Sequence, residues 1–530
     1  MRKRFNITGT CIPEKHFMID ISNKIEKIME LIEDGEYFTI NRPRQFGKTT
    51  SIYMIERALE NSEEYLVIST SFEGIGDLIF EKEKRFSKEF LDILADTLAF
   101  DDEELALFLQ GLENEVNSFK DLSKAIAKFI KKVNKKVVLI IDEVDKSSNN
   151  QLFLSFLGML RNKYLLAQRK KDYTFHSIIL AGVHDVKSLK LRIRPGEEEK
   201  YNSPWNIASD FTVDMSFSPE EIKTMLDDYI ENKGVSLDRK YFSEKLYYYT
   251  SGYPFLVSKL CKIIDERIMP VDKFVWEKEY MDMAVKEILK DSNTNFDSLI
   301  KNIENNEELY RFVEKIIIDG ETISYIKTDK IINLGTIYGL LKNKENICKI
   351  NNRIYEQLLY DHMMIKIIRQ DRKSVMSDYN YKSFFIKEDG TLDVKKILIK
   401  FQEFMKKEYS KKRKEFLEAD GRLVFLAFIS PIVNGIGFAF KEVQGAEEKR
   451  FDVVITYKEK MYIIELKKWY GEVYHKRGLL QLGEYLEQYG LDEGYLLIFD
   501  FRKEKANITE VKEEVAIVNG KSKKIYEAFV

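Results

Sequence analysis

Three consecutive residues near the N-terminus, Gly47, Lys48 and Thr49, have the types and order that hold a nucleoside triphosphate. They follow a short apolar stretch, 37–40, and precede a helical pattern. In such a loop the backbone N–H groups and the next helix N-terminus surround the phosphates, the lysine contacts the β- and γ-phosphates, and the hydroxyl ligates Mg²⁺. We therefore expect ATP and Mg²⁺ as cofactors. The other loop residues that we expect at the nucleotide are Arg44, Gln45, Phe46 and Thr50.

This motif is incomplete at its start. The pattern G-x-x-x-x-G-K-[ST] requires glycine at position 42, where this chain has Arg42 followed by Pro43. A lone Gly-Lys-Thr also fits an ordinary surface turn with a lysine, because short patterns recur by chance. The nucleotide interpretation therefore depends on a second motif.

The second motif is an apolar run, 136–141, that ends abruptly in the acids Asp142 and Glu143, with Asp145 close behind. Such a run is typical of a buried parallel strand whose carboxyl end lies at the ligand-binding edge of an open α/β sheet. We expect Asp142 to hold Mg²⁺ through water and Glu143 to orient the attacking water. A core strand that merely stops at a charged turn explains the apolar run but not the two acids. Together the motifs predict a nucleotide hydrolase.

The elements that must position these residues form an alternating pattern. Further strands are predicted at 65–72, 177–182 and 211–216, and helical segments, the first at Ser22–Glu33, separate the strands. Alternating strands and helices predict an α/β fold with a mostly parallel sheet. His184 follows the strand at 177–182 and is a candidate sensor of the γ-phosphate, although an ordinary polar residue fits that position too.

The basic loop after His184 offers a candidate arginine finger. Arg192 and Arg194 lie in this loop, for which a solvated charged surface is the simpler interpretation. Further on, Ser218, Pro219 and Glu221 form an N-cap, a first-turn proline and a capping box, which predicts the start of a helical region. This region extends to about residue 290.

The next part of the chain predicts two smaller segments. Residues 291–370 combine helices with the short strand 347–350, a pattern that fits a helical module with a small β wing, as in a winged helix. Residues 371–410 are charged and weakly periodic. We interpret them as a linker or connecting helices.

The C-terminal quarter, 411–530, contains a second set of residues that suits chemistry. A hairpin is predicted from strands 450–457 and 461–468. Glu465 and Lys467 are two residues apart on one strand and share a face, while Asp452 lies on the paired strand. The two carboxylates and the Leu466 carbonyl are suitable Mg²⁺ ligands. Lys467 is then placed to position or deprotonate a metal-bound water that attacks a phosphodiester.

Charged residues on the exposed face of a hairpin are ordinary, so neighbouring features matter. A helix with Glu418 precedes the hairpin, and a helix with Gln481 and Tyr485 on one face follows it. Basic residues nearby would attract a phosphate backbone. These are Lys458, Lys460, Lys468, Lys476 and Arg477.

Composition limits the possible classes. With 530 residues, of which 44% are hydrophobic, the chain suits three or four domains at roughly 150 residues each. The three cysteines are far apart, which favours a reducing compartment without disulfides or a zinc site. No signal peptide and no run of about 18 apolar residues is present, so we expect a cytoplasmic protein without membrane contact. The net charge of −3 means that nucleic acid would need a local basic patch.

These motifs resemble known families. The segments 41–49 and 139–145 resemble bacterial AAA-like ATPases whose phosphate loop reads R-P-R-x-[FY]-G-K-[ST], so that Arg42 is expected. Gly252-Tyr253-Pro254 resembles the G-x-P element in the helical lid of STAND-type ATPases, which usually precedes a winged helix. Asp452, Glu465, Lys467 and Gln481 resemble the motifs of PD-(D/E)xK nucleases, with Glu418 matching the acid of the first helix.

The resemblance implies a P-loop NTPase sheet with a helical lid and a winged-helix module, plus a C-terminal α/β domain of the PD-(D/E)xK type. The corresponding boundaries are 1–217, 218–290, 291–370, a linker at 371–410, and 411–530. It further implies an ATP-gated, Mg²⁺-dependent nuclease acting on DNA rather than RNA, with foreign or mobile DNA as a target, and it allows a homo-oligomer.

Two alternatives stay open. One is an ATP-dependent switch or scaffold that binds nucleic acid or protein without cleavage. The other is a STAND-like sensor that oligomerises when it detects a ligand.

Overall fold

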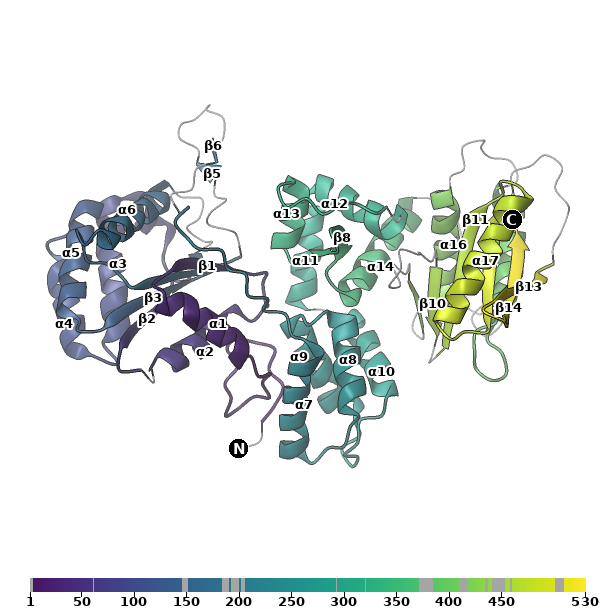
Figure 1. Cartoon of the computed structure of the whole chain (residues 1–530), viewed down its shortest axis with the longest axis horizontal. Coiled ribbons are helices and arrows are strands. Elements are labelled where there is room, and N and C mark those ends of the chain that lie inside the picture. The colour runs from purple at the N-terminus through teal and green to yellow at the C-terminus, as the bar shows by residue number, and fades with distance from the viewer. Residues whose placement is uncertain are drawn as a thin grey trace. The chain divides into compact units, whose positions relative to one another are not determined.

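The computed structural model describes most of the chain. It describes residues 3–530 apart from 61, 145–150, 184–189, 192–199, 202–204, 292, 320, 371–384, 410–417, 434–436, 441–452, 458–459 and 501–509. The chain divides into two units (Figure 1). The first comprises residues 1–299, 327–342 and 351–353, and the second comprises 300–326, 343–350 and 354–530.

A parallel sheet forms the centre of the first unit. Its strands are β1 (Tyr37–Asn41), β2 (Tyr65–Ser71), β3 (Lys136–Asp142) and β4 (Ser177–Gly182), in the order β1-β4-β3-β2. All three pairings are parallel. Every β4 residue is buried, and so are the five β3 residues between Lys136 and Asp142, as expected for strands covered on both faces. This confirms the predicted α/β fold.

Helices cover both faces of this sheet. They are α1 (Ser22–Glu33), α2 (Lys48–Glu60), α3 (Glu83–Leu98), α4 (Glu103–Glu113), α5 (Phe119–Lys132) and α6 (Gln151–Gln168). In Figure 1, α6 lies on one side of the sheet and α1 and α2 lie on the other. The core on the α3–α6 side is rich in phenylalanine, including Phe86 and Phe156, whose rings are 4.9 Å apart. The short strands β5 (Lys190–Leu191) and β6 (Lys200–Tyr201) pair with each other.

The predicted fifth strand at 211–216 is wrong. Here the chain forms no ladder with β1 in the described residues, and its backbone pairing is an isolated bridge between Phe38 and Ser209. The Asp214 carboxylate accepts hydrogen bonds from the backbone N–H and the hydroxyl of Ser216, at 2.9 and 2.8 Å. This local side-chain bonding competes with a sheet ladder for the backbone, and it turns the chain away from the sheet.

The helical lid begins where the sequence indicated. Its helices are α7 (Pro219–Lys233), α8 (Arg239–Thr250), α9 (Pro254–Ile263) and α10 (Glu279–Lys290). Ser218 and Glu221 form the predicted capping box. Gly234 ends α7 with a φ of 66°, a left-handed conformation that suits glycine.

The chain then continues through four helices and a hairpin. These are α11 (Thr294–Glu304), α12 (Glu307–Glu314), α13 (Lys330–Ile337), β7 (Leu341–Lys344), β8 (Ile347–Ile350) and α14 (Arg353–Gln370). The paired strands β7 and β8 lie in the segment where the sequence predicted a wing. The assignment of this segment as a winged helix stays a prediction.

A six-stranded mixed sheet lies in the C-terminal part of the second unit. Its strands are β9 (Gly437–Phe440), β10 (Val453–Tyr457), β11 (Lys460–Lys468), β12 (Glu493–Phe499), β13 (Lys512–Val518) and β14 (Lys521–Phe529), in the order β13-β14-β12-β11-β10-β9. β11, β12 and β14 run parallel. Helix α17 (Glu472–Gln488) lies across one face of this sheet (Figure 1). Its Leu482 and Tyr485 belong to the same buried apolar cluster as Ile463 of β11.

Two further helices, α15 (Val394–Tyr409) and α16 (Glu418–Val433), pack against the same sheet. In α15 the buried Gln402 donates to the Phe529 carbonyl at 2.8 Å. The backbone N–H of Leu392, just before α15, donates to the Tyr462 hydroxyl oxygen at 3.1 Å. Residues that the sequence assigned to a linker thus pack against the C-terminal sheet. We propose that the C-terminal domain begins near residue 385.

No helix in the described part of the chain is long and apolar enough to cross a membrane.

Candidate functional site

The phosphate loop joins the end of β1 to the start of α2. Two of its residues have left-handed backbones, Gln45 with a φ of 57° and Gly47 with a φ of 80°. Residues with a side chain rarely adopt this backbone conformation, so the turn favours glycine directly before Lys48. The loop therefore brings the N-terminus of α2 to the carboxyl edge of the sheet, which is the arrangement that binds phosphate.

Arg42, at the position of the missing first glycine, ties β1 to neighbouring segments. Its backbone N–H donates to the Gly182 carbonyl at 3.1 Å, at the end of β4. Its guanidinium donates to the carbonyls of Asn41 and Val213, at 2.8 and 2.5 Å, and lies over the Phe211 ring. Burial lowers the pKa of this guanidinium. A large side chain is thus accommodated beside the loop, which explains the departure from the usual motif.

The three residues with the central predicted roles lie close together. Lys48 is buried, and its ammonium donates to the Arg42 carbonyl at 3.1 Å, inside the loop. The Thr49 hydroxyl lies 3.5 Å from Oδ2 of Asp142. A threonine hydroxyl can ligate Mg²⁺ directly, and a carboxylate beside it can accept hydrogen bonds from water on the ion. Thr49 and Asp142 therefore fit a shared magnesium site.

Glu143 is held in an unusual backbone conformation at the same edge. Its φ is 53°, and its N–H donates to Oδ1 of Asp142 at 2.8 Å. Left-handed non-glycine residues are uncommon and concentrate at functional sites. The other predicted residues of this edge, His184, Asp145, Arg192 and Arg194, lie outside the described residues.

The lid contacts the phosphate loop through a residue whose role the sequence did not show. The Tyr253 hydroxyl donates to the Arg44 carbonyl at 2.6 Å, and its ring meets the Phe46 ring edge-on at 4.8 Å. Gly252, with a φ of 72°, has no room for a side chain, because a Cβ there would lie 2.0 Å from the Phe217 carbonyl oxygen. The Gly-x-Pro pattern was visible in the sequence. Its contact with the phosphate loop depends on tertiary structure.

Other loop residues connect to segments far away in the sequence. Gln45 donates to the Thr294 hydroxyl at 3.4 Å, and the Thr50 hydroxyl accepts from the backbone N–H of Cys11 at 3.1 Å. Gly339 lies against Pro43 so closely that a Cβ would be 2.6 Å from the proline ring. The loop is therefore in contact with the N-terminal segment, the lid and residues that follow the lid.

Removal of the Tyr253 hydroxyl tests the contact between lid and loop. Tyr253→Phe keeps the ring packing and loses one hydrogen bond, with a net contribution of about 1 kcal/mol. We expect ATP binding to weaken by roughly five-fold, as measured by titration of a fluorescent ATP analogue. Tyr249→Phe is the matched control, because it removes a lid tyrosine hydroxyl that bonds Asp282 and not the loop. Equal effects of the two variants would contradict a specific role for Tyr253.

In the second unit, β11 places Glu465 and Lys467 on one face. The Glu465 side chain is only 1% exposed, and its Oε1 lies 2.7 Å from the Lys467 ammonium, which is 19% exposed. This face lies under α17, where a Cβ at Gly478 would be 3.9 Å from the Lys467 side chain. The predicted pair is therefore formed, with the lysine nearer to solvent than the acid.

The remaining predicted residues of this site are placed only in part. Asp452 and Lys458 lie outside the described residues. Gln481 in α17 donates to the Tyr485 hydroxyl at 2.5 Å, and Glu418 begins α16. No group of three or more His, Cys, Asp or Glu side chains that could hold a metal occurs within the described ranges, which omit Asp452. The complete Mg²⁺ ligand set thus stays a prediction.

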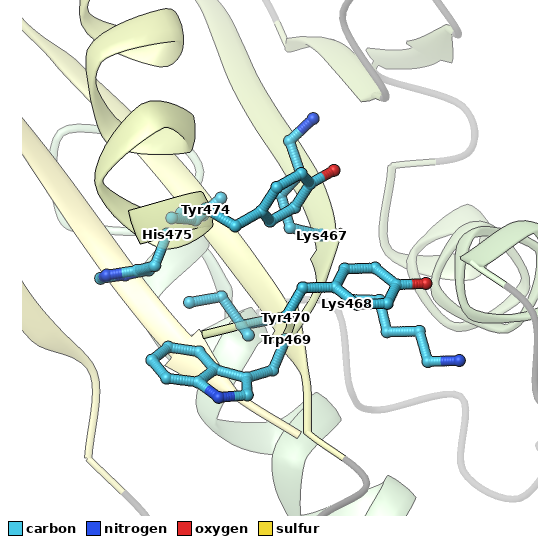
Figure 2. A pocket seen from close by; sticks show the side chains of 8 residues that line it. Lys467, Lys468, Trp469, Tyr470, Tyr474 and His475 are labelled. Carbon is cyan, nitrogen blue, oxygen red and sulfur yellow. The ribbon is translucent and has the colours of Figure 1, made fainter. Parts of the chain in front are cut away.

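A small pocket lies beside Lys467, where β11 leads into α17 (Figure 2). Its volume of about 10 Å³ is close to the space that one water requires. The lining residues are Lys467, Lys468, Trp469, Tyr470, Tyr474, His475, Leu496 and Ile498.

A second buried acid lies in the same row of the sheet. The pairing of β11, β12 and β14 places Glu465, Leu496 and Glu527 side by side. The Glu527 side chain is 2% exposed. Its Oε1 forms a hydrogen bond with Nε2 of His475 at 2.8 Å. Burial raises the pKa of Glu527, and the nearby His475 opposes that shift. Sequence reasoning missed this pair because the alignment of β12 with β14 is tertiary.

The parallel sheet, the phosphate loop and the acids that end β3 define an α/β ATPase of the P-loop class. The sequence matches the AAA-like domain family over residues 9–361, and the chain belongs to this family. A search of curated proteins found no match.

Several solved structures are similar to this chain at low identity. A Walker-type ATPase of Pyrococcus abyssi is 14% identical over 67% of this chain and 99% of that chain, with a TM-score of 0.46. The RuvB Holliday junction branch migration motor of Thermotoga maritima is 13% identical over 64% and 95%, with a TM-score of 0.34. The ORC1 protein of Aeropyrum pernix, in complex with DNA, is 11% identical over 66% and 94%, with a TM-score of 0.30.

Proposed function

We propose that this protein binds and hydrolyses ATP at the edge of the β1–β4 sheet. Lys48 would bind the β- and γ-phosphates, while Thr49 and Asp142 would hold Mg²⁺. Mg²⁺, when bound, supplies positive charge to the phosphate oxygens. Glu143 would orient the attacking water. The observation that carries this proposal is the 3.5 Å approach of the Thr49 hydroxyl to Asp142, beside the buried Lys48 ammonium.

Neutralisation of Glu143 tests the hydrolytic part. Glu143→Gln keeps the size of the side chain and removes its charge, so we expect ATP to bind while hydrolysis falls on the order of 10²-fold or more. Phosphate release and ATP binding are measured on the same preparations. Glu73→Gln is the matched control, because Glu73 is an exposed acid just after β2, at the same sheet edge. Full hydrolysis by Glu143→Gln would refute the assigned role.

We further propose that the C-terminal unit is a Mg²⁺-dependent nuclease of the PD-(D/E)xK type, with DNA as its substrate. Support comes from the Glu465–Lys467 pair, 2.7 Å apart on one face of a central strand. Glu465, with Asp452, would hold Mg²⁺, Lys467 would orient the attacking water, and Gln481 in α17 would contribute to the same site. ATP state would control cleavage, which makes the protein an ATP-gated nuclease. We also propose that the protein is located in the cytoplasm.

A second candidate is an ATP-dependent switch whose C-terminal unit binds without cutting. The nearly complete burial of Glu465 against the Lys467 ammonium favours it, because such a pair also serves as a structural ion pair. ATP hydrolysis without any Mg²⁺-dependent cleavage is the result that would distinguish the switch from the nuclease.

A further inference from the structure

Aromatic side chains gather where β11 leads into α17. Trp469, Tyr470 and Tyr474 follow Lys467 within seven residues and line the small pocket. Tyr470 is 65% exposed and Tyr474 is 41% exposed, while Val473 between them is 72% exposed. Large apolar surfaces rimmed by polar groups commonly mark binding sites. This cluster lies directly beside the Glu465–Lys467 pair.

The two tyrosine rings form an open corner. Their centroids are 5.4 Å apart and their planes are nearly perpendicular, at 82°. In such a pair the edge of one ring points at the face of the other, so a planar group that stacks on the first ring would present its own edge to the face of the second. Figure 2 shows both rings on the side of the pocket to which the Lys467 and Lys468 side chains extend, with Trp469 and His475 on the other side.

Basic residues lie near this corner on the end of β11 and on α17. The Lys468 ammonium lies 5.8 Å from the centre of the Tyr470 ring. Lys476 and Arg477 are exposed on the first turns of α17, and Arg477 follows Tyr474 by three residues, so the two share a helix face. The Tyr470–Tyr474 corner and these cations thus combine planar apolar faces with groups that attract phosphate.

We propose that this tyrosine corner, with Lys468, Lys476 and Arg477, binds unpaired nucleotides of a nucleic acid strand by base stacking. This inference rests on the proposed function of the adjacent Glu465–Lys467 pair. It narrows the substrate class to single-stranded nucleic acid and to duplexes with frayed ends. Bases in a duplex are already stacked on one another and offer no free face. A stacked base contributes about 1–3 kcal/mol, regardless of its sequence, while the basic groups track the backbone.

Binding to short oligonucleotides tests the stacking. The full chain is titrated in EDTA, which prevents Mg²⁺-dependent cleavage, with a labelled oligothymidylate and with a duplex of equal length. We expect Tyr470→Leu/Tyr474→Leu to weaken single-strand binding by roughly 5- to 100-fold and to leave duplex binding unchanged. Tyr470→Phe/Tyr474→Phe should bind like wild type, because phenyl rings also stack.

The cations have a different expected signature. Lys476→Gln/Arg477→Gln should weaken single-strand and duplex binding alike and reduce the salt dependence of both. Trp469 supplies an independent readout, because Trp205 and Trp276 are buried, at 0% and 3% exposed. Oligothymidylate should quench tryptophan fluorescence in wild type and not in Trp469→Phe.

The outcomes separate this inference from the nuclease proposal. Strong tyrosine-dependent binding without cleavage in Mg²⁺ would support stacking and contradict the nuclease. Cleavage that the leucine variant retains in full, or equal loss of duplex and single-strand binding, would overturn stacking and leave the nuclease intact. If wild type binds neither oligonucleotide, the inference fails and the corner is better explained as a surface for a protein partner.

Discussion

Lys48→Ala is expected to abolish detectable ATP binding and to lower ATP hydrolysis by on the order of 10²-fold or more. Lys48 supplies the buried ammonium of the phosphate loop, which donates to the Arg42 carbonyl at 3.1 Å. An alanine leaves no cation to face the β- and γ-phosphates. Isothermal titration with ATP and Mg²⁺ measures the binding, and phosphate release measures hydrolysis.

Thermal unfolding separates this effect from a loss of folding. A ligand that binds only the native state raises the melting temperature, by an amount that follows from its concentration and affinity. ATP should therefore raise the melting temperature of wild type but not that of Lys48→Ala. Lys27→Ala is a suitable control, since Lys27 is an exposed lysine on α1. An equal ATP-induced shift in Lys48→Ala would contradict the assignment of this loop to the phosphates.

The second large effect is expected at the C-terminal pair. Lys467→Ala should abolish Mg²⁺-dependent cleavage of plasmid and single-stranded DNA, because the proposed reaction needs its ammonium beside the attacking water. Glu465→Gln should have the same result through loss of a metal ligand. Cleavage is followed on gels with and without ATP. A dependence of the wild-type rate on ATP would show that the two activities are coupled.

The burial of Glu465 demands a stability control for this experiment. Lys467→Ala leaves a carboxylate that is 1% exposed without the nearby ammonium, which is costly in the folded state. Unfolding of each variant is therefore measured beside its activity. Lys524→Ala is the matched variant, because Lys524 lies on β14 of the same sheet with its side chain largely exposed. It should cleave nearly as wild type does.

One result would remove the nuclease proposal for these substrates. Suppose that wild type hydrolyses ATP but cleaves neither plasmid nor single-stranded DNA, whether or not ATP is present. The Glu465–Lys467 pair is then best explained as a structural ion pair. The protein would then be an ATP-dependent switch.

Sequence reasoning could predict the position of the proposed ATPase site because its motifs are local. Gly47, Lys48 and Thr49 are adjacent, and the acids Asp142 and Glu143 end a continuous apolar strand. Parallel strands present their carboxyl ends at one edge, so the two motifs were expected to meet there. The structure places the Thr49 hydroxyl 3.5 Å from Asp142. The strand predicted at 211–216 does not form, because the Asp214 side chain accepts a hydrogen bond from the Ser216 backbone N–H, which outweighs the β-prone sequence pattern.

The sequence by itself determined the class of this protein, because phosphate binding and strand burial each depend on residues that are close along the chain. Only the tertiary structure decided that Tyr253 bonds the Arg44 carbonyl, that Arg42 joins β1 to Val213, and that Glu527 shares a sheet row with Glu465. Those contacts join residues that are far apart in sequence. They depend on how strands and helices align, which no local pattern encodes.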